Sequence, residues 1–326
     1  MTSKKIIAVV GGTGSQGGGL VRAILDDWNG PFSVRVLTRD PGSVKAKEFA
    51  ARGAEVVQAD LDDEEGLGTA FEGAYGAFVV TNFWAQLTPE QEALRGGARM
   101  ELDHAANAAR AAKAAGLKHV VWSTLEDTRP HFEFLGSEPP TIGDGYKVPH
   151  FDAKHEANAG FIALGVPTTF LETSFFYEMF IAAGLSPRRD STGTAALTLP
   201  MGDSVMALVA AEDIGRTAYG IFQAGARFVG RTVGLAGTHA TGKQLADLFA
   251  KVLGEPVVYR PMTHQQLRAA GFPEAEELGN MFQFFTEAAE TFVGNRDRDL
   301  IRTINPRLQT LEDWLAEHHE QLKAAL

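Results

Sequence analysis

The chain of 326 residues contains no cysteine. Disulfides, thiolate nucleophiles and cysteine-based redox switches are therefore excluded, and any response to redox state must come from a bound cofactor. No apolar stretch approaches the roughly 20 residues that a membrane span requires. Residues 1–5 lead straight into an apolar run, so we expect no export signal. These absences favour a cytoplasmic protein without a membrane segment.

Clusters of basic residues are also missing. The net charge is −11, and the nearest basic groups are Arg188-Arg189 and the pair Arg296 and Arg298. Nucleic-acid binding requires clustered Lys and Arg to displace phosphate counterions, so we expect no direct contact with nucleic acid. Short groups of acidic residues and histidine at 101–104 and 318–319 lack further ligands nearby, and we expect no metal site.

The most informative stretch present is rich in glycine. An apolar run of strand length, 6–10, is followed by glycines at positions 11, 14 and 17 and by an amphipathic helical pattern over 20–25. This spacing supplies a tight turn, a close backbone approach to a pyrophosphate and helix–strand packing, while the helix N-terminus faces the phosphates. The alternative is a glycine-rich turn that binds nothing. The dinucleotide contacts expected in this loop are Gly11, Thr13, Gly14, Ser15, Gln16 and Gly17.

Short apolar runs alternate with helical patterns up to about residue 172. This alternation predicts an α/β fold with a Rossmann-type, doubly wound parallel sheet over 1–172. Beyond it, over 173–326, we expect a smaller α+β lobe on the substrate or partner side, with some segments returning to the sheet. Strands are expected at 6–10, 33–37, 55–58, 76–80, 119–123, 168–172, 197–199, 232–235 and 257–259. Helices are expected at 20–28, 43–51, 64–71, 90–115, 151–164, 211–223, 241–253, 263–270, 275–292 and 310–326.

The second expected strand ends at Arg39, which lies 22 residues after Gly17. An arginine in this place can grip a 2′-phosphate with its guanidinium fork, so we predict NADP(H) as the cofactor. Arg39 can also be a plain surface charge, and the adjacent Asp40 leaves some NAD use open. Asp60 follows the third strand, where it either lies near the adenine or caps the next helix.

Polar and aromatic side chains follow the later strands, at the edge where open α/β sheets bind ligands. Thr81, Asn82 and Phe83 follow the fourth strand, and Ser123 ends the fifth. A long segment, 125–149, is rich in proline, glycine and aromatic residues, and a segment of this length is usually functional or disordered. Beyond it His150 and Lys154 are spaced i, i+4 on one helix face.

By this point the sequence resembles the NmrA-like branch of the short-chain dehydrogenase/reductase superfamily, and especially its NADPH-sensing members. The matching motifs include Gly11-Gly12-Thr13-Gly14-x-Gln16-Gly17, Thr38-Arg39-x-Pro41, Val80-Thr81-Asn82-x-Trp84 and His150-Phe151-Asp152-x-Lys154, and others run nearly to the C-terminus. The resemblance implies an NADP(H)-binding Rossmann domain with a smaller C-terminal lobe. The nucleotide contacts that it adds beyond the loop are Arg39, Asp60, Leu61, Thr81, Asn82, Phe83 and Lys154, with Phe176 and Glu178 at the nicotinamide end. Gly-Ser-Val at 42–44 replaces basic residues of the NADPH sensors, which weakens the expected grip on the 2′-phosphate.

The resemblance leaves two functions open. The superfamily's enzymes generally use Tyr-x-x-x-Lys, but here His150 occupies the tyrosine position, and Tyr146 lies before Pro149. His150 is either a general acid, as imidazoles exchange protons near neutral pH, or a helix-start residue without a chemical role. Lys154 contacts the cofactor or also transfers a proton, and Ser123 is the third catalytic candidate.

The missing tyrosine favours a sensor that passes NADP(H) occupancy to a regulatory protein partner, and this is the function we expect. The alternative is an NADPH-dependent oxidoreductase that reduces a small carbonyl, quinone, imine or enone, with 125–149 as its lid. The sequence also leaves a homodimer open.

Overall fold

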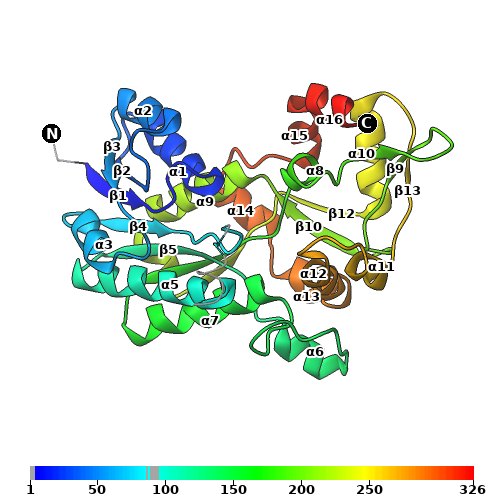
Figure 1. Cartoon of the computed structure of the whole chain (residues 1–326). Helices are drawn as coiled ribbons and strands as arrows, with labels where there is room; N and C mark the ends of the chain where they lie inside the picture. Colours follow the sequence, from blue (N-terminus) through cyan, green and yellow to red (C-terminus); the bar gives the residue numbers. More distant parts are fainter. Residues whose placement is uncertain (1–3, 86, 89–94) are drawn as a thin grey trace.

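The structure, a computed structural model, describes residues 4–85, 87–88 and 95–326, which form a sheet lobe and a smaller lobe (Figure 1). The sheet lobe contains seven parallel strands in the order β11-β6-β5-β4-β1-β2-β3. Their bounds are β1 Lys5–Val9, β2 Phe32–Thr38, β3 Glu55–Gln58, β4 Gly76–Val79, β5 His119–Thr124, β6 Thr168–Glu172 and β11 Thr232–Gly234. The predicted doubly wound parallel sheet is confirmed, and the strand expected at 232–235 returns to its edge.

Apolar helices cover both faces of this sheet (Figure 1). One face packs against α1, α2 and α9, and the other against α3, α5 and α7. The bounds are α1 Ser15–Asp26, α2 Val44–Ala51, α3 Glu64–Phe71, α5 Gly97–Ala114, α7 Pro149–Ala163 and α9 Ala211–Gln223. The predicted start of the first helix at residue 20 was wrong, because buried glycines at 17–19 extend α1 without contributing an apolar pattern. Of the helix expected at 90–115, residues 90–94 lie outside the described residues.

The smaller lobe has its own core and two three-stranded sheets, in the orders β12-β10-β7 and β13-β9-β8. The strands are β7 Phe175–Phe176, β8 Arg188–Arg189, β9 Ala195–Leu197, β10 Val205–Val209, β12 Thr238–Thr241 and β13 Val257–Tyr259. The helices of this lobe are α8 Met179–Ala182, α10 Gly242–Leu253, α11 His264–Arg268, α12 Ala275–Glu287, α13 Ala289–Gly294, α15 Leu311–Glu317 and α16 His319–Ala325. A 3₁₀ turn at Gly225–Phe228 and α14 Arg298–Ile304 pack instead with α9 in the core of the sheet lobe. The helices expected at 275–292 and 310–326 are each interrupted, at Ala288 and at His318.

The segment 125–149 is more ordered than a long loop. It contains α6, Arg129–Leu135, which lies along the lower edge in Figure 1. Phe132 is buried in the core, whereas Phe134 is 87% exposed. The segment therefore packs beside the smaller lobe through one side and leaves an aromatic ring in solvent on the other.

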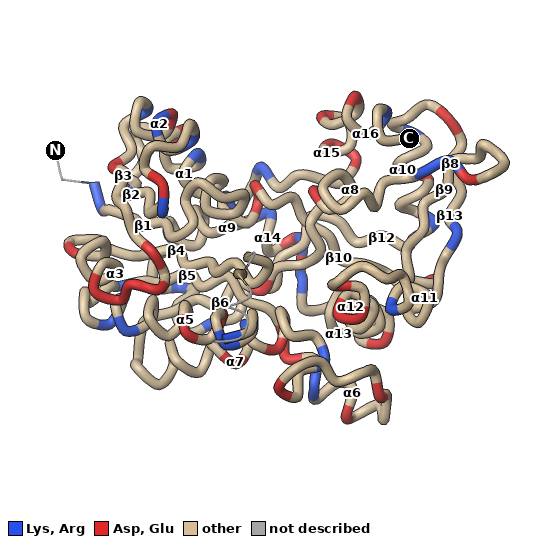
Figure 2. The backbone as a smooth tube through the Cα atoms, viewed as in Figure 1, with Lys and Arg blue, Asp and Glu red and all other residues tan. Residues whose placement is uncertain are grey.

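Charged residues of both signs are interleaved over the two lobes (Figure 2). Within the described ranges, every helix is too short or too polar to cross a membrane. The same part of the chain contains no group of three or more His, Asp or Glu side chains arranged to hold a metal ion.

Helices α1 and α9 are in direct backbone contact. Helix α9 follows β10 of the smaller lobe, so the contact holds this part of the chain against the sheet lobe. A Cβ atom on Gly215 would overlap the backbone nitrogen of Leu20, and one on Gly19 would lie 2.5 Å from the carbonyl oxygen of Glu212. Arg22 adds a hydrogen bond from Nε to Glu212 Oε1 of 3.0 Å. Only glycine allows the two helices to approach this closely.

We expect Gly215→Ala to lower the free energy of unfolding by about 1–3 kcal/mol, because the added methyl group must push two backbones apart. Gly160→Ala in α7 is the matched control, since no atom lies within 4 Å of its Cβ position. The control should be stabilised by roughly 0.5–1 kcal/mol. Urea unfolding measures both variants, and equal midpoints would contradict the close contact.

Candidate functional site

A cavity of about 1120 Å³ runs from the carboxyl edge of the sheet into the smaller lobe. It opens where the strand order reverses between β1 and β4, the place at which doubly wound sheets bind ligands. The predicted site residues that line it are Gly11, Thr13, Gly14, Ser15, Gln16, Gly17, Arg39, Asp60, Leu61, Thr81, Asn82, Phe83, Ser123, His150, Lys154 and Phe176. The structure thus brings together residues from six strands or their following loops.

The glycine loop has a shape that side chains would disrupt. Gly11 has a φ of +64°, and its carbonyl oxygen accepts a hydrogen bond of 2.8 Å from the N–H of Gly14. A Cβ on Gly17 would lie 2.5 Å from the same carbonyl oxygen. Gly14 is the N-cap of α1 and provides no side-chain cap. The first N–H groups of α1 are therefore free to bind an anion in the cavity.

Two basic residues follow β2, and one of them, Arg39, lines the cavity. Arg39 is exposed at the end of β2, and its guanidinium has no partner among the described residues. Lys45, in the first turn of α2, places Nζ 3.2 Å from the carbonyl oxygen of Thr13. Sequence reasoning missed Lys45, because it counted only the three residues after Pro41. Asp60 does not cap the next helix: Asp63 does so, by accepting from the N–H of Gly66.

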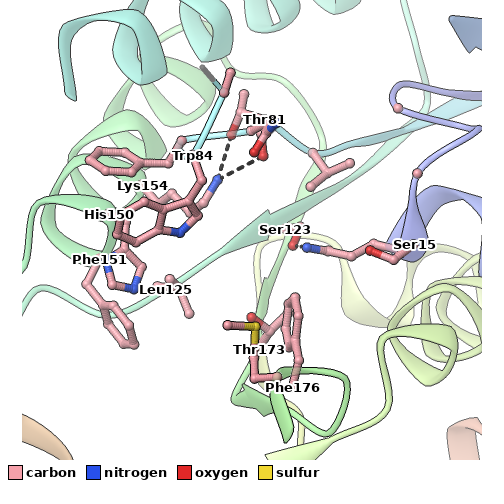
Figure 3. A pocket seen from close by; sticks show the side chains of 18 of the residues that line it. Ser15, Thr81, Trp84, Ser123, Leu125, His150, Phe151, Lys154, Thr173 and Phe176 are labelled. Carbon is pink, nitrogen blue, oxygen red and sulfur yellow. Dashed lines mark hydrogen bonds between the residues drawn. The ribbon is translucent and has the colours of Figure 1, made fainter. Parts of the chain in front are cut away.

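Lys154 is held by a buried carboxylate. Its Nζ donates to Glu101 Oε1 at 2.6 Å and to Thr81 Oγ1 at 2.6 Å, and Thr81 also donates to Glu101. Glu101 on α5 is fully buried, and the Lys154 side chain is 12% exposed (Figure 3). The ammonium also donates to the carbonyl oxygen of Thr81 at 3.4 Å, so three acceptors of the protein hold it in one place.

Ser123 and His150 are also fixed, each by a residue from a different part of the chain. Ser123 Oγ donates to Gln16 Oε1 at 2.7 Å, which ties the end of β5 to the glycine loop. His150 Nδ1 lies 2.5 Å from Glu277 Oε1, and the same oxygen accepts the His150 backbone N–H at 2.8 Å. Glu277 comes from α12 of the smaller lobe, and nothing in the sequence near His150 indicated this partner.

Two expectations about the site were not met. Glu178 does not line the cavity, because both carboxylate oxygens accept the N–H of Ala211 at 3.0 Å, at the start of α9. Helix α9 has no cap of its own, so Glu178 supplies the missing acceptor. The segment 126–149 contributes no residue to the cavity lining, and the idea of a lid there is not supported.

The part of the cavity inside the smaller lobe is strongly apolar. Its walls come from β7, α8, α11, α12, the loops that follow α8 and β9, and the loops that precede α11 and α12. They carry Phe175, Met179, Leu185, Leu199, Pro200, Met262, Leu267, Phe272, Leu278, Met281, Phe282 and Phe285, and the same loops add the polar residues Thr198 and Glu274. We call this part the apolar chamber. Among the described lining residues, the only arginine is Arg39 and the only lysine is Lys154, and neither belongs to the chamber.

Behind the sheet edge lies a buried group of charges. Arg296 is fully buried, and its Nη1 contacts Glu126 Oε1 at 2.6 Å while Nη2 donates to the carbonyl oxygen of Thr173 at 2.5 Å. Burial, with Glu126 nearby, raises the pKa of Glu172 to about 7. Glu172 ends β6, directly before Thr173 and Ser174 of the cavity wall.

The fold and the cavity define an α/β protein of the Rossmann type with a dinucleotide-shaped groove and an adjoining chamber. The NmrA-like family matches residues 3–315, and the chain belongs to this family. It is 32% identical over 271 residues to the NmrA-like oxidoreductase malD of Malbranchea aurantiaca, covering 79% of this chain and 76% of malD. It is 31% identical over 299 residues to the NmrA-like oxidoreductase FrzB of a Cladobotryum species, covering 86% and 83%.

Solved structures share the fold along nearly the whole chain. The negative transcriptional regulator NmrA in complex with NADP superposes with a TM-score of 0.74 and 22% identity, covering 99% of this chain and 97% of that one. An NADPH-dependent quinone oxidoreductase of Escherichia coli in complex with NADPH has a TM-score of 0.68 and 23% identity, covering 97% and 99%. Proteins of this fold therefore include both a regulator and a reductase.

We expect the ionisation of Glu172 to lower the free energy of unfolding of the protein as the pH rises from about 4.5 to 7. Its folded pKa of about 7 exceeds the ordinary value of 4.5, so the folded state binds the proton more tightly, and the stabilisation present at low pH is lost as the pH rises through 7. The difference in free energy of unfolding between Glu172→Gln and the wild type should move in favour of the variant across this interval. Above pH 7 the difference should stay constant. Urea unfolding between pH 4 and pH 8.5 measures the difference, and Glu138→Gln, at an exposed carboxylate, serves as control. Parallel curves for Glu172→Gln and wild type would refute the shift.

Proposed function

We propose that the protein is an NADPH-dependent reductase that acts on a neutral or cationic apolar substrate with a polarised double bond. The observation that carries this proposal is that the groove and the apolar chamber form one cavity of about 1120 Å³. Ser123 touches the glycine loop and His150 touches the smaller lobe, so polar groups stand between the two parts. A nucleotide sensor needs the groove, but it has no use for the chamber.

The residues of the groove fit NADP(H). The uncapped N-terminus of α1 offers N–H groups for the pyrophosphate, and Gly17 leaves the space that a Cβ would fill. Arg39, with Lys45 beside the glycine loop, offers positive charge for the 2′-phosphate. Lys154 is positioned by Glu101 and lines the same cavity, where its ammonium would contact the nicotinamide ribose. When bound, the reduced dinucleotide supplies a hydride.

The chamber limits the substrate by its chemistry. Its described walls carry no lysine or arginine, so a carboxylate or phosphate on the substrate would be desolvated without a partner. Rings of Phe175, Phe282 and Phe285 favour a flat or aromatic substrate. The relatives named oxidoreductases, malD and FrzB, support a catalytic role. The fold shared with NmrA does not distinguish a reductase from a nucleotide sensor.

We expect Arg39→Ala to weaken NADPH binding about 10–100-fold while NADH binding changes little, since charge-assisted hydrogen bonds contribute roughly 1.5–3 kcal/mol. Lys45→Ala should also weaken the binding of NADPH more than that of NADH, but by a smaller factor. Titration by nucleotide fluorescence gives the dissociation constants, and Arg52→Ala, paired with Asp26 outside the cavity, is the control. Equal affinity of the wild type for NADPH and NADH would remove the basis for assigning NADP(H).

We expect Leu278→Asp to raise KM about tenfold or more for quinone, aldehyde, imine or enone probes, because it puts an unpaired charge into the apolar chamber. NADPH affinity should stay unchanged, since Leu278 belongs to the chamber and not to the groove. Val258→Asp on the exposed side of β13 is the matched control. A Leu278→Asp variant with unaltered KM for every reduced probe would mean that substrates bind elsewhere.

A further inference from the structure

His150 is held at the first turn of α7 by a single carboxylate oxygen from α12. Glu277 Oε1 contacts both Nδ1 of the ring at 2.5 Å and the backbone N–H of the same residue at 2.8 Å. The two side chains are each 10% exposed. Because one oxygen bonds the backbone and the ring together, it fixes the rotamer of the imidazole. A carboxylate at Nδ1 also fixes the tautomer, leaving Nε2 as the nitrogen that exchanges a proton.

The Nε2 side of the ring opens to the cavity. His150 lines the cavity, and its Nε2 has no hydrogen-bond partner among the described residues and is not sealed in the protein interior. Figure 3 shows Trp84 beside His150, and their ring centroids are 5.0 Å apart. The ring of Phe83 lies 5.9 Å from the imidazole centroid. These aromatic rings pack against the imidazole, while its Nε2 remains on the side of the cavity.

The neighbouring Lys154 is a poorer proton source. Its ammonium is engaged by Glu101 and Thr81, so a proton leaving it would strand the Glu101 carboxylate in the core. Glu277 itself contacts the imidazole, and Glu274, which precedes α12, is a further carboxylate of the same cavity lining. The Glu101 carboxylate compensates the Lys154 charge one turn along α7. A proton on His150 is therefore next to carboxylates rather than next to an uncompensated cation.

We propose that His150 is the proton donor of the reduction and that Glu277 is its positioning residue; this rests on the reductase function proposed above. In the step, the carbon of a substrate C=O or C=N bond accepts a hydride from the reduced nicotinamide. The heteroatom takes the proton of His150 Nε2, so the double bond becomes CH–OH or CH–NH. The oxidised nicotinamide and a neutral imidazole remain, and solvent reprotonates the imidazole after product release. Glu277 keeps its charge and its bond to Nδ1 throughout.

A spectroscopic test separates positioning from mere structure. Ring ¹⁵N chemical shifts at pH 8 report which nitrogen of a histidine carries the proton, and the His150 signals among the nine histidines are identified by their loss in His150→Gln. We expect wild type and Glu277→Gln, which keeps an acceptor oxygen, to show the Nδ1–H tautomer. Glu277→Leu should show a mixture of both tautomers. A wild-type ring protonated at Nε2, or an unchanged ring in Glu277→Leu, overturns the positioning role.

Kinetics test the proton transfer itself. We expect His150→Gln to lower kcat at least about 100-fold, since a positioned general acid contributes roughly 10²–10⁴-fold. Glu277→Leu should lose about tenfold or more, and Glu277→Gln should recover part of that loss. NADPH affinity should stay within about twofold in all three variants. His319→Gln and Glu320→Gln are matched controls, because they form a His–Glu contact of 3.1 Å on the surface.

The outcomes distinguish the two proposals. Reduction by the wild type with kcat unchanged in His150→Gln overturns the proton-donor role and leaves the reductase standing. A wild type that binds NADPH and reduces none of the quinone, aldehyde, imine and enone probes overturns both. His150→Gln leaves Glu277 in place and keeps the proton-donor test decisive where Glu277→Leu fails to fold.

Discussion

The close contact between α1 and α9 is the constraint on which the rest of the site depends. Gly19 and Gly215 allow the two backbones to touch, and this contact holds the chain of the smaller lobe against the helix that begins at the glycine loop. Glu178, directly before α8, caps the start of α9. The same contact therefore sets both the phosphate end of the groove and, through β7 and α8, one wall of the apolar chamber.

Two buried acid–base pairs organise the chemistry of the cavity, and they differ in function. The Glu101–Lys154 pair lies within the sheet lobe and directs a cation toward the groove. The Glu277–His150 pair joins the sheet lobe to α12, so the imidazole is correctly oriented only when the smaller lobe is in place. For the Glu277–His150 pair, packing of the smaller lobe against the sheet lobe also orients the imidazole in the cavity. Under the proposed mechanism, this arrangement would let a chain without the usual tyrosine keep a proton donor in that position.

The sequence predicts the sheet well because buried parallel strands read as continuous apolar runs bounded by turn residues. The groove was predictable too, since loops after successive strands meet at one sheet edge. The carboxylate partners were not, because Glu101 and Glu277 lie 53 and 127 residues from the groups that they hold. No local pattern encodes such pairings. The start of α1 was missed because the buried glycines at 17–19 give no apolar pattern. The role of Glu178 was missed because its partner, the N–H of Ala211, lies 33 residues away.

The central claim is that groove and chamber hold a hydride donor and its acceptor at the same time. Transfer of deuterium from NADPH labelled at C4 tests this most directly, with mass spectrometry of the product from a single turnover on aldehyde, imine and enone probes, whose reduced carbon keeps the label. The account predicts that one face of the labelled cofactor delivers its deuterium to a carbon of the substrate. Tight binding of the labelled NADPH with no deuterium in any probe would contradict it and point to a protein that only senses the nucleotide.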